Sequence, residues 1–179
     1  AYDTALAQIE SPEARHWSLF YARGISLEQS KKWPRAESDF LKALDLNADH
    51  PLVLNYLGYS WVDRGQNLER AQQMIVKAVA LRPNDGYIAD SLGWVYYKVG
   101  KYKDAVKELD RAVELLPADP IINDHLGDAF WRVGRVREAQ FQWNRILGLN
   151  PKPELEAQVK TKLKVGLKDA AKAKAGNGG

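Results

Sequence analysis

Hydrophobic and small residues recur at helical spacing along most of this chain, in blocks that repeat. Four glycines stand at intervals of 34, 35 and 34 residues: Gly24, Gly58, Gly93 and Gly127. A leucine precedes the last three of them (Leu57, Leu92, Leu126), and an aromatic residue follows three positions later (Trp61, Tyr96, Phe130). A period near 34 residues with small residues at fixed offsets predicts an array of stacked two-helix units.

Further small residues predict where the two helices of each unit touch. Two antiparallel helices can approach closely only where neither carries a large side chain. The expected second helices carry Ala36, Ala71, Ala105 and Ala139, and seven residues later Ala43, Ala78, Ala112 and the exception Ile146. Glycines suited to a left-handed turn follow the first helices at Gly65, Gly100 and Gly134, and Pro83, Pro117 and Pro151 end the second helices. The expected fold is therefore all-α.

The pattern divides the chain into four units, at residues 17–50, 51–85, 86–119 and 120–153. The first unit departs most, with Arg23 for leucine, Lys31 for the turn glycine and Ala48 for the closing proline. The second has one additional residue near Gln66-Asn67-Leu68, where we expect a local bulge. Residues 1–16 are expected to be the remnant of a preceding repeat. Residues 154–170 are expected to form a capping helix with its lysines on the solvated face, and residues 171–179 a disordered tail.

The first residues are Ala-Tyr-Asp, with no initiator methionine, signal peptide or lipid-attachment cysteine. We therefore expect a processed form or a piece of a longer protein.

These residues resemble the tetratricopeptide repeat, whose pattern is Trp-x2-Leu-Gly-x2-Tyr followed by Ala, Phe, Ala and Pro. The resemblance covers residues 17–153 and is most specific in the third unit, around Ser91-Leu92-Gly93-Trp94. It implies a right-handed α-solenoid of antiparallel helix pairs, with the first helices lining a concave groove that binds a partner.

The resemblance also implies which positions line that groove: the second, fifth, ninth, twelfth and thirteenth of each unit. The helical period independently places the last four of these on one face, away from the packing stripe. The predicted partner-binding groove consists of Tyr21, Asn55, Tyr59, Asp63, Tyr87, Asp90, Trp94, Tyr97, Lys98, Asp124, Asp128, Trp131 and Arg132. Its aromatic residues are expected anchors for an extended peptide or a helix of another protein. With Glu28, the groove holds five acidic side chains against two basic ones, so it is expected to be mildly acidic.

An alternative interpretation assigns some of these residues to structure. The aromatic side chains could pack between adjacent first helices, and Trp94 is the first candidate for such a role. Asp90 and Asp124 could cap helices, or pair with Arg132 and Lys98 across units. The Lys/Asn/Arg clamp by which some members of the family bind a C-terminal carboxylate is not expected, because Tyr21, Ile25, Tyr56, Tyr87 and Ser91 stand at its positions.

Catalysis, cofactors and metals have little support in the sequence. The three histidines lack ligand spacing, cysteine is absent, and no phosphate-binding loop or nucleophile elbow is present. His125 with Asp124 and Asp128 could form a metal or acid–base cluster, but no nucleophile or second cluster accompanies them. We expect a non-enzymatic protein without a cofactor or metal.

Charge and hydropathy exclude other classes. No apolar run is long enough for a membrane-spanning helix. The net charge of +3 resides in residues 154–179, whose lysines could contact nucleic acid or an anionic membrane, and the rest is neutral. We expect a solvated tail, no nucleic-acid partner and no direct membrane insertion.

A narrower resemblance rests on Asn55-Tyr56-Leu57-Gly58-Tyr59, Asp90-Ser91-Leu92-Gly93-Trp94 and His125-Leu126-Gly127-Asp128. These segments resemble the C-terminal part of larger bacterial tetratricopeptide proteins of the cell envelope, which include adaptors for a processing protease. That resemblance implies a periplasmic or envelope location, and a cytoplasmic one is the expectation without it. The function we expect is a scaffold or adaptor that binds a partner segment in the groove. The alternative is a structural homo-oligomer that stacks through its terminal units.

Overall fold

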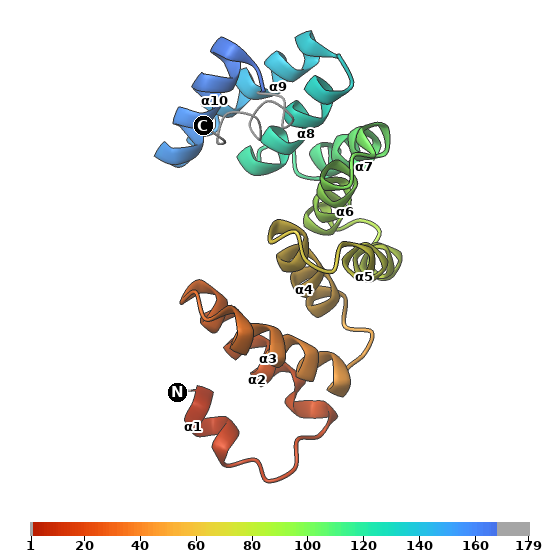
Figure 1. The fold of residues 1–179 in the computed structure, drawn as a ribbon, viewed down its shortest axis with the longest axis vertical. Helices are drawn as coiled ribbons and strands as arrows, with labels where there is room; N and C mark the ends of the chain where they lie inside the picture. The colour runs from red at the N-terminus through yellow and green to blue at the C-terminus, as the bar shows by residue number, and fades with distance from the viewer. Residues whose placement is uncertain (1, 168–179) are drawn as a thin grey trace, which may run out of the picture. The chain divides into compact units, whose positions relative to one another are not determined.

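The computed structural model describes residues 2–167, which form helices joined by turns, with no strand among them (Figure 1). The helices are α1 (Tyr2–Ala7), the 3-10 helix η1 (Ala14–His16), α2 (Trp17–Gln29), α3 (Trp33–Leu46), α4 (Pro51–Asp63), α5 (Leu68–Leu81), α6 (Gly86–Lys98), α7 (Tyr102–Leu115), α8 (Pro120–Arg132), α9 (Val136–Leu147) and α10 (Pro153–Val165). The chain divides into two compact units, Ala1–Pro83 with α1–α5 and Asn84–Gly179 with α6–α10.

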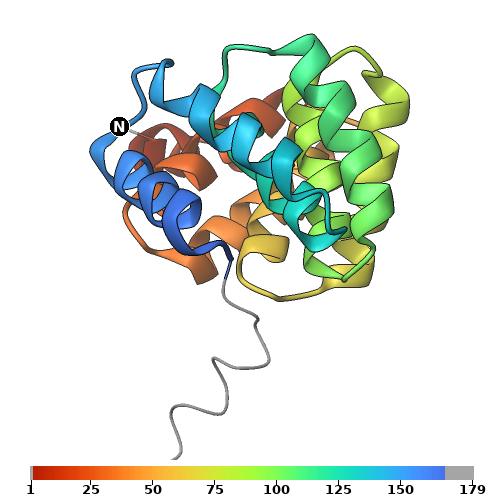
Figure 2. The same ribbon diagram turned by 90° about the horizontal axis from the view of Figure 1, so that it is seen from above.

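Consecutive helices pack in pairs within each unit, α2 with α3 and α4 with α5 in the first, α6 with α7 and α8 with α9 in the second (Figures 1 and 2). Each pair falls inside one of the four predicted repeat units. The prediction of an all-α solenoid built from helix pairs is confirmed. The exact boundaries between the repeats stay a prediction.

The four recurring glycines lie where the two helices of a pair come closest. A Cβ atom at Gly58 would lie 2.8 Å from Ile75, and one at Gly93 would lie 2.5 Å from Leu109. Real Cβ atoms essentially never come this close to a neighbour, so a side chain cannot enter unless the facing side chain or its helix shifts. The alanines predicted to face these glycines, Ala36, Ala71, Ala105 and Ala139, are fully buried.

The turns inside the pairs share one backbone conformation. Gly65, Gly100 and Gly134 have φ of 66°, 81° and 82°, and Lys31 takes the same left-handed conformation in the first pair with φ of 60°. The additional residue of the second pair is absorbed at Asn67, which is also left-handed with φ of 46° and immediately precedes α5. Asparagine tolerates this conformation better than most residues, so the extra residue is accommodated in the turn.

The two ends of the described chain carry additional helices. Helix α1 contacts α2, and Asp3 on α1 accepts a hydrogen bond from Arg23 of α2 at 2.9 Å. The assignment of residues 1–16 to a preceding repeat stays a prediction. Helix α10 packs on α9 and buries Leu155 and Val159. It ends at Val165, and the predicted helix end at residues 168–170 and the predicted disordered tail at 171–179 lie outside the described residues.

Candidate functional site

Three aromatic rings form a stack on the second unit. Trp94 and Tyr97 lie three residues apart on α6, so both project from the same side of that helix. Their ring centroids are 4.7 Å apart and their planes differ by 4°. The indole of Trp94 also stacks on the imidazole of His125 from α8, at 3.9 Å and 14°. Trp94 and Tyr97 are half-buried, so the stack holds their rings while leaving part of them at the surface.

A buried contact between His125 and Asp90 holds the histidine end of this stack. His125 Nδ1 lies 2.8 Å from Asp90 Oδ1 of α6, and both side chains are about nine-tenths buried. Burial alone would lower the pKa of His125, but the charge of Asp90 and its hydrogen bond outweigh burial and raise that pKa. Asp90 therefore pairs with His125, and the residue that caps α6 is Asp85. The pair favours the protonated form of the imidazole that stacks on Trp94.

The acidic residues of α8 have an internal partner that the sequence analysis missed. Lys162 Nζ of α10 lies 2.7 Å and 2.8 Å from the two carboxylate oxygens of Asp124 and 2.7 Å from Asp128 Oδ1. Trp143 Nε1 of α9 also donates to Asp128, at 3.1 Å. Asp124 and Asp128 lie one helical turn apart, so one ammonium group bridges both. The expectation that the lysines of this last helix are solvated is wrong for Lys162, whose side chain is only 15% exposed.

The charges in this cluster shift one another. Burial and the nearby charge of Asp124 raise the pKa of Asp128, although Lys162 opposes that rise. Burial would lower the pKa of Lys162, but the two carboxylates outweigh it and raise that pKa. The pair of carboxylates is therefore tolerated inside the protein because the lysine lies between them.

Two of the remaining predicted residues of the second unit, Lys98 and Arg132, lie beside the stack. Lys98 is exposed and its Nζ lies 5.6 Å from the Trp94 ring. Arg132 Nε donates to Tyr97 Oη at 3.2 Å. Tyr87 is 60% exposed at the start of α6, whereas Trp131 is half-buried and its ring lies 5.5 Å from that of the buried Trp143. The structure thus brings Trp94, Tyr97, Lys98 and Arg132 together, which we call the α6–α8 surface.

The predicted groove residues of the first unit have different surroundings. Tyr21 packs among Trp17, Phe40 and Tyr56, and burial raises its pKa. Asn55 and Tyr59 are half-buried, and Asp63 is exposed. Tyr21 thus packs against other rings of its unit, as the alternative interpretation of the aromatic side chains allowed, and its place in the groove stays a prediction.

Glu28 organises a polar cluster in this first unit. It accepts a hydrogen bond from Ser60 at 2.8 Å and pairs with Arg64 at 3.1 Å. The Arg64 guanidinium lies 4.1 Å from the centre of the Trp33 ring. Burial raises the pKa of Tyr56, and Glu28 raises it further. Glu28 is therefore committed to neighbouring side chains and is not a free charge for a partner.

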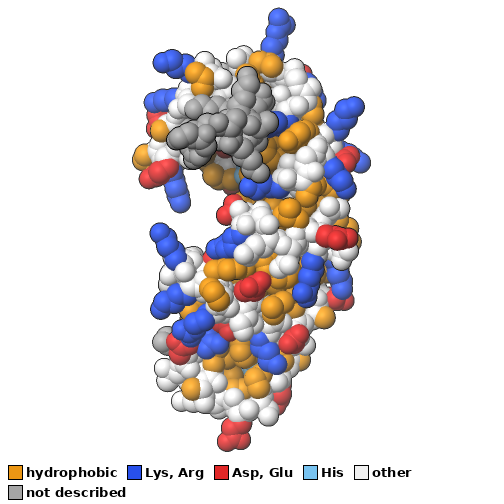
Figure 3. Space-filling view, viewed as in Figure 1, with side chains coloured by type: hydrophobic (Ala, Val, Ile, Leu, Met, Phe, Trp, Pro, Cys, Tyr) orange, Lys and Arg blue, Asp and Glu red, His pale blue; other side chains and the backbone are white. Residues whose placement is uncertain are grey.

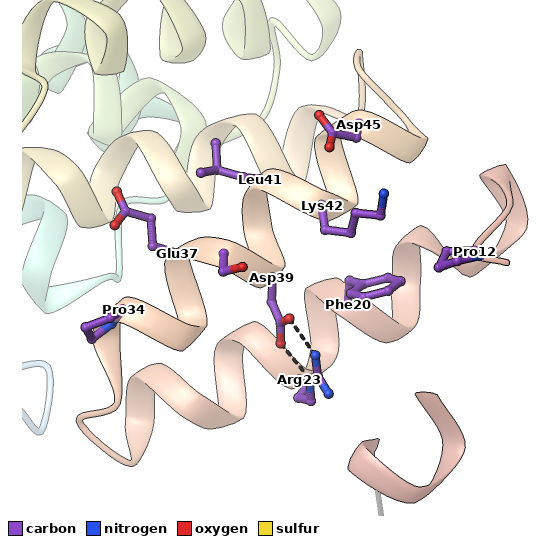
Figure 4. A pocket seen from close by; sticks show the side chains of 10 residues that line it. Pro12, Phe20, Arg23, Pro34, Glu37, Asp39, Leu41, Lys42 and Asp45 are labelled. Carbon is purple, nitrogen blue, oxygen red and sulfur yellow. Dashed lines mark hydrogen bonds and ion pairs between the residues drawn. The ribbon is translucent and has the colours of Figure 1, made fainter. Parts of the chain in front are cut away.

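An open cavity of about 610 Å³ lies beside α2 and α3 (Figure 4). Phe20, Leu41 and Pro12 supply its apolar lining. Arg23, which stands where the repeat pattern has leucine, makes two hydrogen bonds of 2.7 Å to the buried Asp39. Arg23 and Asp39 therefore satisfy each other, but Glu37, Lys42 and Asp45 also line the cavity, so it offers both apolar and charged contacts.

The residues 2–167 that the structure describes contain neither a metal-ligand cluster nor a membrane-spanning helix. Among them, no three or more His, Cys, Asp and Glu side chains gather as metal ligands would. None of the helices is both long and apolar enough to cross a membrane. On the face seen in Figure 3, charged side chains of both signs are interspersed with hydrophobic ones.

The pH dependence of folding tests the pair of His125 and Asp90. Because the pKa of His125 is raised in the folded protein, its contribution to stability is complete below about pH 6.5, its unfolded value, and is lost as the pH rises through the raised pKa. In Asp90→Asn, His125 loses its nearest carboxylate, and only Asp124 and Asp128 still favour its charged form. Burial of the imidazolium should therefore destabilise the folded variant at low pH. We expect the variant to be less stable by about 1–3 kcal/mol near neutral pH, with a larger deficit at pH 5 than at pH 8.

Urea unfolding followed by circular dichroism at pH 5, 6.5 and 8 measures this deficit. The matched control is Asp63→Asn, which changes an exposed aspartate on α4 and should leave the pH profile unchanged. An Asp90→Asn deficit that stays constant between pH 5 and pH 8 would contradict an ionised pair.

Comparisons with known proteins agree with the architecture. A family model described as tetratricopeptide repeat matches residues 21–86, and one described as TPR repeat matches residues 93–134. The TPR repeat-containing protein PA4667 of Pseudomonas aeruginosa is 35% identical over 92 residues, which cover 51% of this chain and 16% of that protein. The chain therefore spans about one sixth of that relative.

Solved structures show the same fold at low sequence identity. A structure titled as the functional characterisation of Pseudomonas aeruginosa pilF has a TM-score of 0.69 at 16% identity, covering 88% of this chain and 72% of that one. MamA from Desulfovibrio magneticus RS-1 (residues 41 to the end) has a TM-score of 0.66 at 24% identity, covering 76% and 78%. The two family-model matches together take in more than half of the residues, and the helix pairs pack as that repeat requires. The chain therefore belongs to the tetratricopeptide repeat proteins.

Proposed function

We propose that this protein is a scaffold that binds a segment of a partner protein on the α6–α8 surface. Tetratricopeptide repeats act in general as protein-interaction scaffolds and are generally non-catalytic. The observation that carries the proposal is the stack of Trp94 on Tyr97 and His125. Half-exposed aromatic rings that are held in place bind with little loss of side-chain entropy, which is typical of interface anchors.

The neighbouring contacts support the same surface. His125, which Asp90 holds in place, stacks on Trp94. Arg132 and Lys98 lie close to the rings of Tyr97 and Trp94. Trp94 and Tyr97 therefore have basic side chains beside them, whereas the ring of Tyr21 lies among the rings of Trp17, Phe40 and Tyr56. We therefore place the partner's apolar side chains over Trp94 and Tyr97.

Substitution of the two half-exposed rings, Trp94 and Tyr97, tests this proposal. Peptides are selected from a random phage-displayed library against the purified chain, and their dissociation constants are then measured by fluorescence anisotropy. We expect Trp94→Ala with Tyr97→Ala to weaken these peptides by at least about tenfold, since an aromatic anchor contributes about 2 kcal/mol or more. The matched control is Phe141→Ala, which removes an aromatic ring that is 65% exposed on α9.

Circular dichroism separates lost binding from lost folding, because both variants should keep the helical signal of the parent protein. Since removal of Trp94 also uncovers His125, Lys98→Ala provides a second variant that leaves the stack intact. Peptides that bind the double variant as tightly as the parent protein would show that the partner site lies elsewhere.

A further inference from the structure

The turns that join α6 to α7 and α8 to α9 form a basic edge. Six cationic side chains lie in or beside these two turns: Lys98, Lys101, Lys103, Arg132, Arg135 and Arg137. Arg132 connects the turns, because its guanidinium lies 6.0 Å from the Tyr97 ring and 5.9 Å from the Tyr102 ring. The two turns are therefore neighbours, and their charges act on the same region of the surface.

Most of this positive charge has no internal counterion. Lys98, Lys101, Lys103 and Arg137 are exposed, and none of them forms an ion pair within residues 2–167. The first turns of α7 and α9 carry the carboxylates Asp104 and Glu138. Glu138 pairs with Arg135 at 3.0 Å, and Asp104 is exposed. Cations therefore outnumber anions on this edge.

The acidic residues predicted for the same groove are not available to balance it. Asp90 is paired with His125, and Asp124 and Asp128 are paired with Lys162. All three carboxylates are buried. The groove that the sequence analysis expected to be mildly acidic therefore presents aromatic rings and cations in the second unit.

We infer that the partner segment bound by the second unit is acidic, with Asp or Glu side chains placed beside an apolar residue. The inference rests on the proposed function and adds the chemistry of the partner. The apolar residue covers Trp94 and Tyr97, and the flanking carboxylates lie against Lys98 and the basic edge. Lys98 connects the two parts, since it lies over Trp94 and ends the helix next to the turn. Complementary charge across such a surface accelerates association and excludes basic partners.

An acidic peptide is favoured over nucleic acid by the extent of the charge. The edge spans only two turns and contains the carboxylates Asp104 and Glu138. The residues outside 154–179 have no net charge, so the basic region does not extend over the rest of the protein. A polyphosphate backbone carries a uniform negative charge and would meet these two carboxylates.

Three matched peptides test the inference. Each is a fluorescein-labelled twelve-residue peptide with one central tryptophan, flanked by Asp and Glu in the first, by Asn and Gln in the second, and by Lys in the third. We expect the acidic peptide to bind at least about tenfold more tightly than the neutral one, and the basic one to bind most weakly. Binding of the acidic peptide should weaken when the NaCl concentration is raised from about 50 to about 300 mM, because salt screens exposed charges.

Charge reversal of the edge provides the second measurement. Lys98→Glu with Lys101→Glu and Lys103→Glu should remove most of the preference for the acidic peptide. The matched control is Lys107→Glu with Lys152→Glu and Lys164→Glu, which changes the net charge equally at exposed sites away from the two turns. Helical circular dichroism should be the same for both triple variants.

The outcomes separate the two proposals. Peptides that need Trp94 and Tyr97 but show no preference for acidic flanks would overturn the inference and leave the proposed function standing. An acidic preference that survives loss of both rings but not charge reversal would overturn the proposed function and the placement of the apolar residue, and would leave only the acidic character of the partner standing. Tighter binding of a twelve-nucleotide single strand than of the acidic peptide would overturn the assignment of the edge to a protein partner.

Discussion

Lys162→Met is expected to destabilise the protein by about 3–5 kcal/mol, because it leaves two buried carboxylates without their cation. Lys162 lies between Asp124 and Asp128, and these aspartates are 8% and 7% exposed. Methionine keeps the length and the helix propensity of lysine, so the loss reports the missing charge. The free energy of unfolding, measured by urea denaturation with circular dichroism, gives the size of the effect.

The pH dependence of this variant identifies the cause. The pKa of Asp128 is raised in the parent protein by burial and by Asp124, and loss of Lys162 should raise it further. An acid whose folded pKa lies above its unfolded value destabilises the fold when it is ionised. The deficit of Lys162→Met should therefore be full at pH 7 and should shrink as the pH falls through the raised pKa.

Lys160→Met is the matched control for this prediction. Lys160 lies on the same helix and pairs with Glu156 at 2.6 Å, but its side chain is 62% exposed. An exposed pair of this kind contributes at most about 1 kcal/mol. If both variants lose the same small amount of stability, Lys162 does not hold a buried charge cluster together.

Gly127→Ala is the second substitution with a large expected effect, a loss of about 2–4 kcal/mol. Its Cβ atom would lie 2.5 Å from Nε1 and 2.6 Å from Cδ1 of Trp143. Trp143 is fully buried and donates to Asp128, so the indole cannot move without losing that hydrogen bond. Overpacking and the lost bond outweigh the gain of about 1 kcal/mol that alanine brings to a helix.

The free energy of unfolding of Gly127→Ala and Gly148→Ala, measured by chemical denaturation, compares a glycine with no room for a Cβ atom with one that has room. The Cβ atom of Gly148→Ala would lie 3.5 Å from the nearest atom, the carbonyl oxygen of Arg145, which is an ordinary contact. Gly148→Ala should therefore change stability by no more than about 0.5 kcal/mol. A Gly127→Ala protein as stable as the parent would show that α8 and α9 do not meet as closely as the structure has them.

The α6–α8 surface was predictable in part. Trp94, Tyr97, Lys98 and Arg132 follow from the repeat register, because each position of a repeat faces the same way in every unit. The pair of His125 with Asp90 has a signal in the sequence: the two residues lie 35 positions apart, which is close to the length of one repeat. Side chains at neighbouring positions of consecutive repeats can meet. This spacing predicts a contact of Asp90 with His125 in preference to one with Lys98 or Arg132.

Lys162 had no such signal. The segment after residue 153 departs from the repeat, so its register against α8 depends on how Leu155 and Val159 pack on the core of the second unit. The lysines of that segment look alike in the sequence, yet Lys162 is buried and Lys160 is exposed. The effect on the groove is large, because this one lysine neutralises two of its predicted acids.

By itself, the sequence determined the helix pairs, their turns and the positions of closest approach, because these depend on the size and backbone preference of residues that recur along the chain. The tertiary structure alone decided which charges remain at the surface. Burial and pairing of Asp90, Asp124 and Asp128 depend on side chains 34 to 38 residues away. Contacts over such separations arise only after the repeats have stacked, and they change the expected groove from acidic to aromatic and basic in the second unit.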